Sequence, residues 1–290
     1  MTMGIGAFFR RLFRPGPIQV DYSGTADDRL KSLWRERHKL TGHAVDELTK
    51  ELARRGIEMR SAEPEPKVEP SFDPAWRAIL QKRVPFYDRL PPARRARFEQ
   101  KLAQFVETKR FVPADGMTIT DEVKVVIAAT ACRLMINLPI LFLEPLQWVK
   151  VHPKAFRDSS GRTVCGIGCR EFVEIAWREL LQGLKNPSDG FNPGYHEFAH
   201  VLDALDGLDG VPPCLSPLLY GYWVEVMNEE FVRAVRGQSW LSPYSATDKL
   251  ELFAVATEMF FEMPKTMRTH HPDLFEILAA FYRQRPSGSR

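Results

Sequence analysis

Two histidines with a glutamate between them are the residues of this chain best placed to do chemistry. The segment reads His196-Glu197-Phe198-Ala199-His200. On a helix four residues advance about 400°, so His196 and His200 would share one face, one turn apart. Two imidazole nitrogens so placed can reach one Zn²⁺ at roughly 2.0–2.1 Å. Glu197 would lie beside the metal, where it can take a proton from a bound water. The pattern predicts metal-assisted hydrolysis.

The surrounding residues favour a helix that could hold two ligands rigidly. We expect Asn192 as its N-cap, Pro193 at its first position and Gly207 as its terminator. By chance the five-residue pattern would occur in roughly one protein of this length in a hundred. One face of the helix must be buried, because the neighbours are apolar: Phe198, Ala199, Val201 and Leu202. Buried histidines without partners are costly, so the context favours a metal site.

A catalytic zinc needs a third protein ligand and an open position. None of the other histidines has the short downstream spacing of a three-histidine site: His38, His43, His152, His270 and His271. A carboxylate is the better candidate, and six glutamates lie on two later predicted helices: Glu225, Glu229, Glu230, Glu251, Glu258 and Glu262. Spacing does not choose among them. Glu251 also fits a capping role, three residues after Asp248.

Helices dominate the predicted elements that must position these residues. Residues 26–56 predict one helix or a pair, and amphipathic or buried helices are expected at 90–110, 120–137, 220–237, 247–264 and 271–286. Two apolar segments, "WVKVHP" at 148–153 and "EFVEIAW" at 171–177, predict strands. We expect the second strand to offer an edge to an extended peptide. Many helices with few strands indicate an α+β fold.

Composition excludes several classes of protein. The net charge of +3 is too slight to indicate direct nucleic-acid binding. Cys132 and Cys214 are expected to be reduced core thiols, and packing is favoured over a metal half-site for Cys165 and Cys169. The apolar run at 125–143 contains Arg133, Asn137 and Pro139, which favours a buried helix over a membrane span. No convincing secretion signal is found, so we expect a cytoplasmic protein.

Three segments are expected along the chain. Residues 1–71 form a helical extension that ends in the Pro/Glu-rich linker "SAEPEPKVEPS" at 61–71. Its first 19 residues are basic and apolar, and a frayed tail is favoured there over a membrane or partner contact. Residues 72–285 form the main domain, and 286–290 a disordered tail.

Three longer motifs carry a resemblance to a known family. They are "HEFAHVLD" at 196–203, "YSATDKLELFAVATEMFFEMP" at 244–264 and "LAQFVETKRFVPADG" at 102–116. Together they resemble the Mlc titration factor A family, zinc-dependent peptidases of the zincin group. The resemblance covers about residues 72–285. The chain departs from the family in two places. Residues 1–71 have no counterpart in the family, and Lys249-Leu250 stands where the family has Pro-Ala.

The resemblance implies a complete site. It implies one Zn²⁺ held by His196, His200 and Glu251, with Glu197 as the general base. Tyr244 would donate a hydrogen bond to the oxyanion of the tetrahedral intermediate. It implies a metallopeptidase acting on peptides or proteins, with endopeptidase and aminopeptidase action both open. The family's name implies an alternative role, the binding of a transcriptional repressor.

From spacing, two further acidic residues are candidates to support the site. Glu258 lies two turns after Glu251 and would either orient a zinc histidine or pair with a neighbouring cation. Asp203, three residues after His200, is a second candidate for orienting a histidine. Spacing leaves both roles open.

Overall fold

The computed structural model describes residues 22–35, 42–57, 70–205, 207, 209–212 and 217–287. The expectations for the basic tail, most of the linker and Cys214 lie outside these residues. The chain divides into two compact units, Met1–Val68 and Glu69–Arg290.

The first unit contains two short helices, α2 (Asp27–Arg35) and α3 (Gly42–Arg54). Its core is small: Leu30, Leu48 and Leu52 pack together, with four partly buried apolar side chains around them. Arg55 closes the unit, because it donates to the Thr25 carbonyl at 2.6 Å and to Asp27 at 2.7 Å. Of the two alternatives expected for residues 26–56, one helix or a pair, the pair is present.

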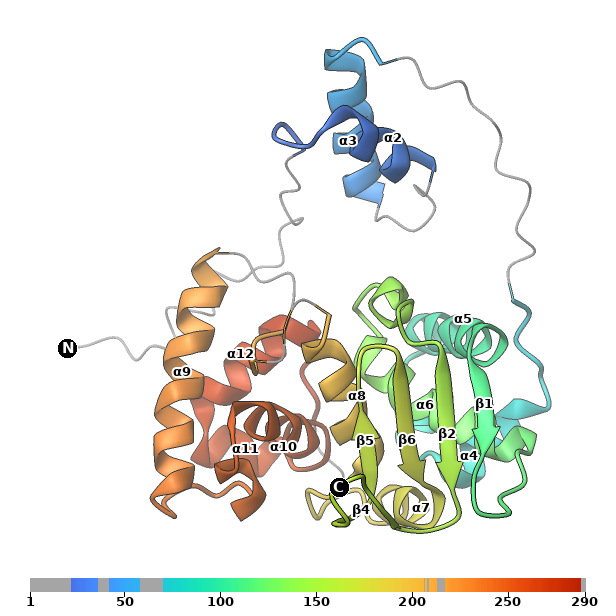
Figure 1. The fold of residues 1–290 in the computed structure, drawn as a ribbon, viewed down its shortest axis with the longest axis vertical. Coiled ribbons are helices and arrows are strands. Elements are labelled where there is room, and N and C mark those ends of the chain that lie inside the picture. The colour runs from blue at the N-terminus through green and yellow to red at the C-terminus, as the bar shows by residue number, and fades with distance from the viewer. Residues whose placement is uncertain are drawn as a thin grey trace. The chain divides into compact units, whose positions relative to one another are not determined.

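The second unit is mostly helical (Figure 1). Its helices are α4 (Trp76–Arg83), α5 (Pro92–Thr108), α6 (Asp121–Met135), α7 (Trp177–Lys185), α8 (Pro193–Asp203), α9 (Pro217–Val235), α10 (Lys249–Glu262), α11 (Pro264–His270) and α12 (Pro272–Tyr282). Short 3₁₀ turns lie at Tyr87–Arg89, Ile140–Leu143 and Pro243–Ala246. Proline stands at the first position of α5, α8, α11 and α12, where its missing N–H costs nothing. The α+β, mostly helical fold expected from the sequence is confirmed.

A small mixed sheet lies beside these helices. Its strands are β1 (Arg110–Pro113), β2 (Trp148–His152), β5 (Gly166–Gly168) and β6 (Phe172–Ala176), in the order β1-β2-β6-β5. The pairs β1–β2 and β2–β6 are parallel, and β5–β6 is antiparallel. A separate hairpin joins β3 (Phe156–Arg157) to β4 (Thr163–Val164).

Both predicted strands exist, but the expectation of an edge at "EFVEIAW" is wrong. That segment forms β6, which pairs with β2 on one side and β5 on the other. In the described part of the chain, β5 is the outer strand on this side of the sheet. Its Gly-Ile-Gly sequence lacks the apolar alternation by which a strand is usually recognised.

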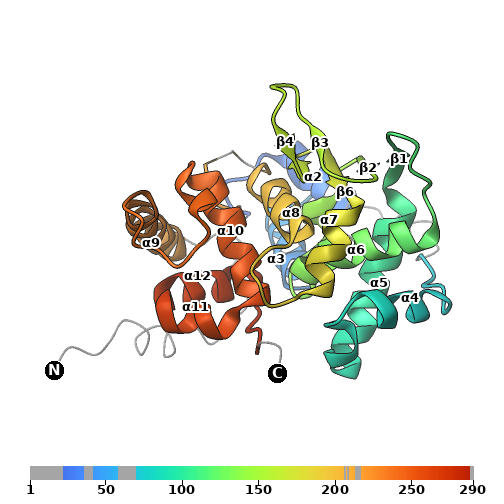
Figure 2. The same ribbon diagram turned by 90° about the horizontal axis from the view of Figure 1, so that it is seen from below.

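Helices cover one face of the sheet, as Figure 2 shows for α5, α6, α7 and α8. Val149, Val151, Val173 and Ile175 point into this covered face and are fully buried. On the opposite face Trp148 and Phe172 stack with ring centroids 4.7 Å apart. The alternation of buried and half-exposed residues along β2 and β6 follows from the strand period of two.

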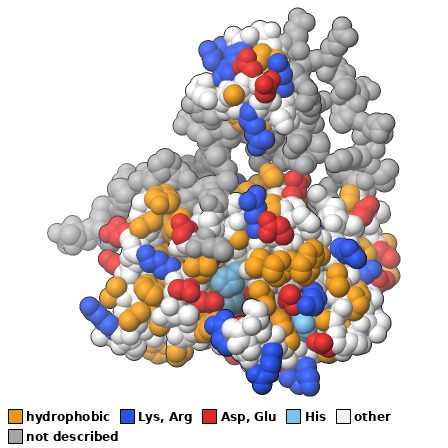
Figure 3. All heavy atoms as spheres, in the orientation of Figure 1, with side chains coloured by type: hydrophobic (Ala, Val, Ile, Leu, Met, Phe, Trp, Pro, Cys, Tyr) orange, Lys and Arg blue, Asp and Glu red, His pale blue; other side chains and the backbone are white. Residues whose placement is uncertain are grey.

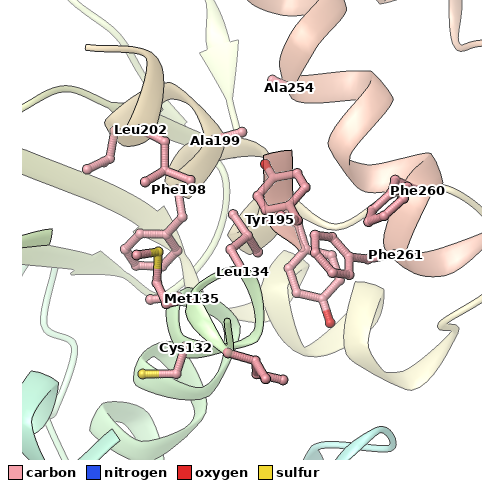
Figure 4. Close-up of a cluster of buried hydrophobic side chains, with 14 of the residues drawn as sticks. Cys132, Leu134, Met135, Tyr195, Phe198, Ala199, Leu202, Ala254, Phe260 and Phe261 are labelled. Atoms are coloured by element: carbon pink, nitrogen blue, oxygen red, sulfur yellow. The ribbon is translucent and has the colours of Figure 1, made fainter. Parts of the chain in front are cut away.

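The core positions α8 between its neighbours. Figure 4 shows side chains from α6, α8 and α10 in one hydrophobic cluster, with Tyr195 close to Phe261. The apolar run predicted as a buried helix is α6, which ends at Met135, before Pro139. No helix in the described residues is long and apolar enough to cross a membrane.

The expected end of the histidine helix is wrong. α8 ends at Asp203, well before Gly207. The buried Asp203 carboxylate accepts the Gly210 N–H at 3.2 Å, and this contact holds the returning chain against the end of the helix. Asp203 therefore contacts the loop that follows α8.

Candidate metal centre

α8 brings the two histidines together as the spacing predicts. Asn192 is the N-cap, and its side chain accepts the Tyr195 N–H at 3.1 Å. One turn separates His196 from His200, and their Nε2 atoms lie 3.2 Å apart. Both side chains are largely buried, so the helix presents two fixed nitrogens to one point.

Glu251 reaches the same point from α10. Its Oε2 atom lies 2.9 Å from His196 Nε2 and 3.4 Å from His200 Nε2. Asp248 caps α10 by accepting the Glu251 N–H at 2.9 Å, which leaves the Glu251 carboxylate directed at the histidines. His196, His200 and Glu251 thus form a group able to hold a metal ion.

The donor spacing tests whether a metal fits. In a tetrahedral site with bonds of 2.0–2.1 Å, ligand atoms are separated by roughly 3.3 Å. The three separations here, 2.9, 3.2 and 3.4 Å, surround that value. The donor set of two imidazoles and one carboxylate is also one that zinc takes in catalytic sites.

Glu258 contacts the second ring nitrogen of His196. Its Oε2 atom lies 3.0 Å from His196 Nδ1, and its Oε1 atom accepts the Asn192 N–H at 2.7 Å. Burial lowers the pKa of His196, but the hydrogen bonds to Glu251 and Glu258 raise that pKa well above its usual value. With Nδ1 donating to Glu258, a metal ion at Nε2 would take the place of the proton shared with Glu251. Of the two roles considered for Glu258, contact with a histidine is the one observed.

Glu197 is buried between α8 and β5. Burial raises the pKa of its carboxyl, and the neighbouring His196 and His200 partly oppose that rise. Two glycines of β5 make room for it. A Cβ on Gly166 would lie 2.4 Å from Glu197 Oε1, and one on Gly168 would lie 2.3 Å from the Glu197 carbonyl oxygen.

The contact of these two glycines with Glu197 was not predicted from the sequence. In "CGIGC" only Cys165 and Cys169 were singled out, and packing was favoured over a metal role for them. Gly166 and Gly168 alternate along the strand, and glycine inside a strand often marks the close approach of another backbone. That pattern was the available signal.

Tyr244 lies on the 3₁₀ turn Pro243–Ala246, ahead of α10. Its hydroxyl donates to Glu251 Oε1 at 3.2 Å, and its ring centroid is 5.9 Å from that of His196. Partial burial and the nearby Glu251 carboxylate raise the pKa of the phenol to about 12. The side chain is half-exposed, so its hydroxyl remains a donor at the open side of the group.

The remaining glutamates considered as ligands lie elsewhere. Glu230 accepts from Ser239 at 2.6 Å and lies 3.0 Å from His271 Nδ1. Glu262 accepts from Asn192 Nδ2 at 3.0 Å. Glu225 and Glu229 are exposed on α9. Of the six, Glu251 is the carboxylate that contacts both histidines.

The site is open at the surface. Figure 3 shows histidine and acidic side chains at the boundary between the α8 and α10 regions, with a hydrophobic strip next to them over the sheet. The histidine and acidic side chains are therefore visible from this face of the molecule.

This domain is mostly helical α+β, with two histidines on one helix and a glutamate on another. That arrangement is typical of a metallo-peptidase. Comparison with known protein families gives the same class. The chain belongs to the glucose-regulated metallo-peptidase M90 family, whose sequence model matches residues 58–283. The family resemblance expected from the three motifs is confirmed.

Similar proteins cover most of this length. An uncharacterized Synechocystis protein, slr2042, is 32% identical over 229 residues, which are 72% of this chain and 83% of that protein. Mlc titration factor A of Klebsiella pneumoniae strain 342 is 28% identical over 232 residues, 73% of this chain and 86% of its own. The protein of that name in Pectobacterium atrosepticum is 28% identical over 212 residues, 64% and 79% of the two chains.

Proposed function

We propose that this chain is a zinc-dependent peptidase, with His196, His200 and Glu251 as the metal ligands. The observation that carries the proposal is the convergence of three donor atoms within 3.4 Å of one another, beside a buried glutamate. In this proposal residues 72–285 are the catalytic domain. The cytoplasm is the proposed location, where the unpaired Cys132, Cys165 and Cys169 would stay reduced.

Each side chain then has a distinct task. Zinc held by His196, His200 and Glu251 would supply a Lewis acid that lowers the pKa of a bound water. Glu197 takes the proton from that water and passes it to the leaving amine nitrogen. Its buried environment suits this exchange, because a raised pKa brings a carboxyl closer to neutral pH. Tyr244 turns its hydroxyl from Glu251 to the developing oxyanion, where the hydrogen bond strengthens with charge.

We propose that the substrate peptide binds along β5. This strand is an outer strand in the described sheet, and its glycines lie against Glu197. An extended peptide that adds to this edge would have its scissile bond beside the catalytic glutamate. The absence of side chains at Gly166 and Gly168 also allows the close approach of backbone to α8.

Metal analysis and a peptide-library assay on the full chain test the proposal. We expect one zinc per chain and cleavage that Glu197→Gln removes without loss of zinc. Glu251→Ala should lose zinc affinity. N-terminally blocked peptides separate endopeptidase from aminopeptidase action. A Glu197→Gln protein that cleaves at the normal rate would refute the proposed base, and full zinc affinity in Glu251→Ala would refute the ligand.

A second candidate function comes from the relatives. Several of them bear the name Mlc titration factor A, which names a protein that titrates Mlc. We therefore keep the binding of a transcriptional repressor as the alternative, with hydrolysis secondary. Pull-down with the Glu197→Gln form discriminates the two. A partner retained intact by the wild-type protein and the variant alike favours binding. A protein trapped by the variant and cleaved by the wild type favours peptidase action.

A further inference from the structure

A second recess lies at the opposite end of α10 from the metal centre. It is a cavity of about 130 Å³ between the 85–94 segment, α6, the start of α8, the end of α10 and residues 285–287. Glu262 lines it, whereas Glu251 contacts the histidines. Eleven residues of helix separate the two glutamates, which corresponds to roughly 16 Å. The cavity is thus distinct from the candidate metal centre, and the proposed peptidase mechanism does not use it.

Four arginines line this cavity: Arg89, Arg94, Arg133 and Arg285. Arg285 is paired with Glu276 at 2.5 Å. Arg133 is held in place from several sides. Its guanidinium lies 5.0 Å from the Phe86 ring centroid and 4.9 Å from that of Phe261, and it donates to Gln284 at 2.8 Å. An arginine clamped between two rings presents its planar fork with little entropy left to lose.

One acidic group faces these cations. Glu262 is 3% exposed, and one of its oxygens accepts from Asn192 at 3.0 Å. The other oxygen, Oε2, has no hydrogen-bond partner among the described residues. Burial raises the pKa of this carboxyl to about 8, with the Asn192 hydrogen bond opposing the rise. A carboxyl whose pKa is raised in this way can hold its proton and donate a hydrogen bond.

Apolar side chains separate these polar groups. Phe86, Tyr195 and Phe261 contribute rings, and Pro85, Pro91 and Pro187 contribute rigid apolar surface. A polar contact made here is therefore partly shielded from water, which strengthens an interaction with charge. Four arginines and one glutamate line the cavity, so it favours a negatively charged ligand over a positively charged one.

We propose that this cavity binds the oxyanion group, phosphate or carboxylate, of a small molecule between Arg133, Arg94 and Glu262. Arg133 would bind two of the anion's oxygens through its fork, and Glu262 would donate to a third. Arg94 would approach from the exposed rim. The occupant would lie against Asn192, the cap of the helix that carries both histidines.

Calorimetric titration of the zinc-loaded full chain tests this site. Inorganic phosphate and succinate are the two probes, and the tighter of them identifies the class of anion. Saturable binding with millimolar or lower Kd is expected for at least one. The same binding must persist after zinc is removed with a chelator. An anion bound to the metal itself would instead be lost with the zinc. No saturable binding, or binding that depends on zinc, would overturn the proposal.

Three variants locate the anion. Arg94→Gln should weaken binding about tenfold, because it removes one charged hydrogen bond. Arg97→Gln is the matched control: Arg97 is exposed on the same helix and does not line the cavity, so binding should not change. Glu262→Gln should bind as well as or better than wild type, because an amide still donates. Equal weakening by Arg94→Gln and Arg97→Gln, or loss of binding in a folded Glu262→Gln protein, would place the anion elsewhere.

Discussion

Replacing Gly168 by alanine should displace the proposed catalytic helix. The new Cβ would lie 2.3 Å from the Glu197 carbonyl oxygen and 3.0 Å from His200 Cβ. Ordinary contact begins at 3.4 Å, so β5 and α8 must separate by about 1 Å at this point. A helix backbone cannot move aside as the end of a side chain can. The site therefore shifts as a unit.

The expected magnitude follows from overpacking. Inserting a methyl group into a tightly packed place costs about 1–3 kcal/mol of unfolding free energy. For a domain of this size that corresponds to a fall in melting temperature of roughly 2–12 °C. In the proposed peptidase, a 1 Å misplacement of Glu197 should also lower the rate about 100-fold. Thermal melts followed by circular dichroism and peptide hydrolysis measure the two effects separately.

Two further alanine variants make the experiment decisive. At Gly166 the added Cβ meets Cγ and Oε1 of Glu197, both at 2.4 Å. A side chain can change rotamer whereas a helix backbone cannot, so activity should fall with less loss of stability than in Gly168→Ala. At Gly221, on α9, nothing lies within 4 Å, and alanine should stabilise the helix by about 0.5–1 kcal/mol. If Gly168→Ala melts and cleaves like wild type, or if Gly221→Ala is equally damaged, the close packing of β5 on Glu197 is wrong.

Three other outcomes are expected. Glu258→Gln should weaken zinc affinity about 10- to 100-fold in a chelator competition, because it alters the bond that orients His196; unchanged affinity would exclude that role. Asp248→Ala should cost about 1 kcal/mol in a thermal melt, through loss of the cap of α10; an unchanged melting temperature would contradict it. Glu262 has its pKa raised from 4.5 to about 8 in the folded state, so unfolding free energy should fall as pH rises across that interval. Glu262→Gln should remove that part of the slope in denaturant titrations at several pH values, and an identical slope would refute it.

The sequence predicted those parts of the site that depend on local spacing. Asn192, His196 and His200 lie within three turns of one helix, so capping rules and the helical period suffice to relate them. β5 was missed for a physical reason. It has three residues, two of them glycine. Its proposed role depends on the absence of side chains at Gly166 and Gly168, and a missing side chain gives no hydrophobic pattern to recognise. The end of α8 was also missed, because its C-cap is Ala204, a residue type that does not signal a helix end.

Spacing alone left six glutamates open and the family resemblance implied Glu251; the packing of α10 on α8 explains why Glu251 is the one that contacts both histidines. Along α10, Glu262 meets Asn192, Glu258 meets Asn192 and His196, and Glu251 meets His196 and His200. The contacts run in opposite directions along the two chains, so the helices pack antiparallel.

Three carboxylates at 251, 258 and 262 share one face of α10, because their spacings of seven and four residues are close to whole turns. Burying them is costly unless each finds a partner. The partners on α8 are Asn192, His196 and His200, which follow one another along the helix. If α10 shifted by one residue, its carboxyl groups would rotate by about 100° away from these partners. The same three contacts that these buried carboxyl groups make with α8 therefore also set the register that brings Glu251 to the histidines.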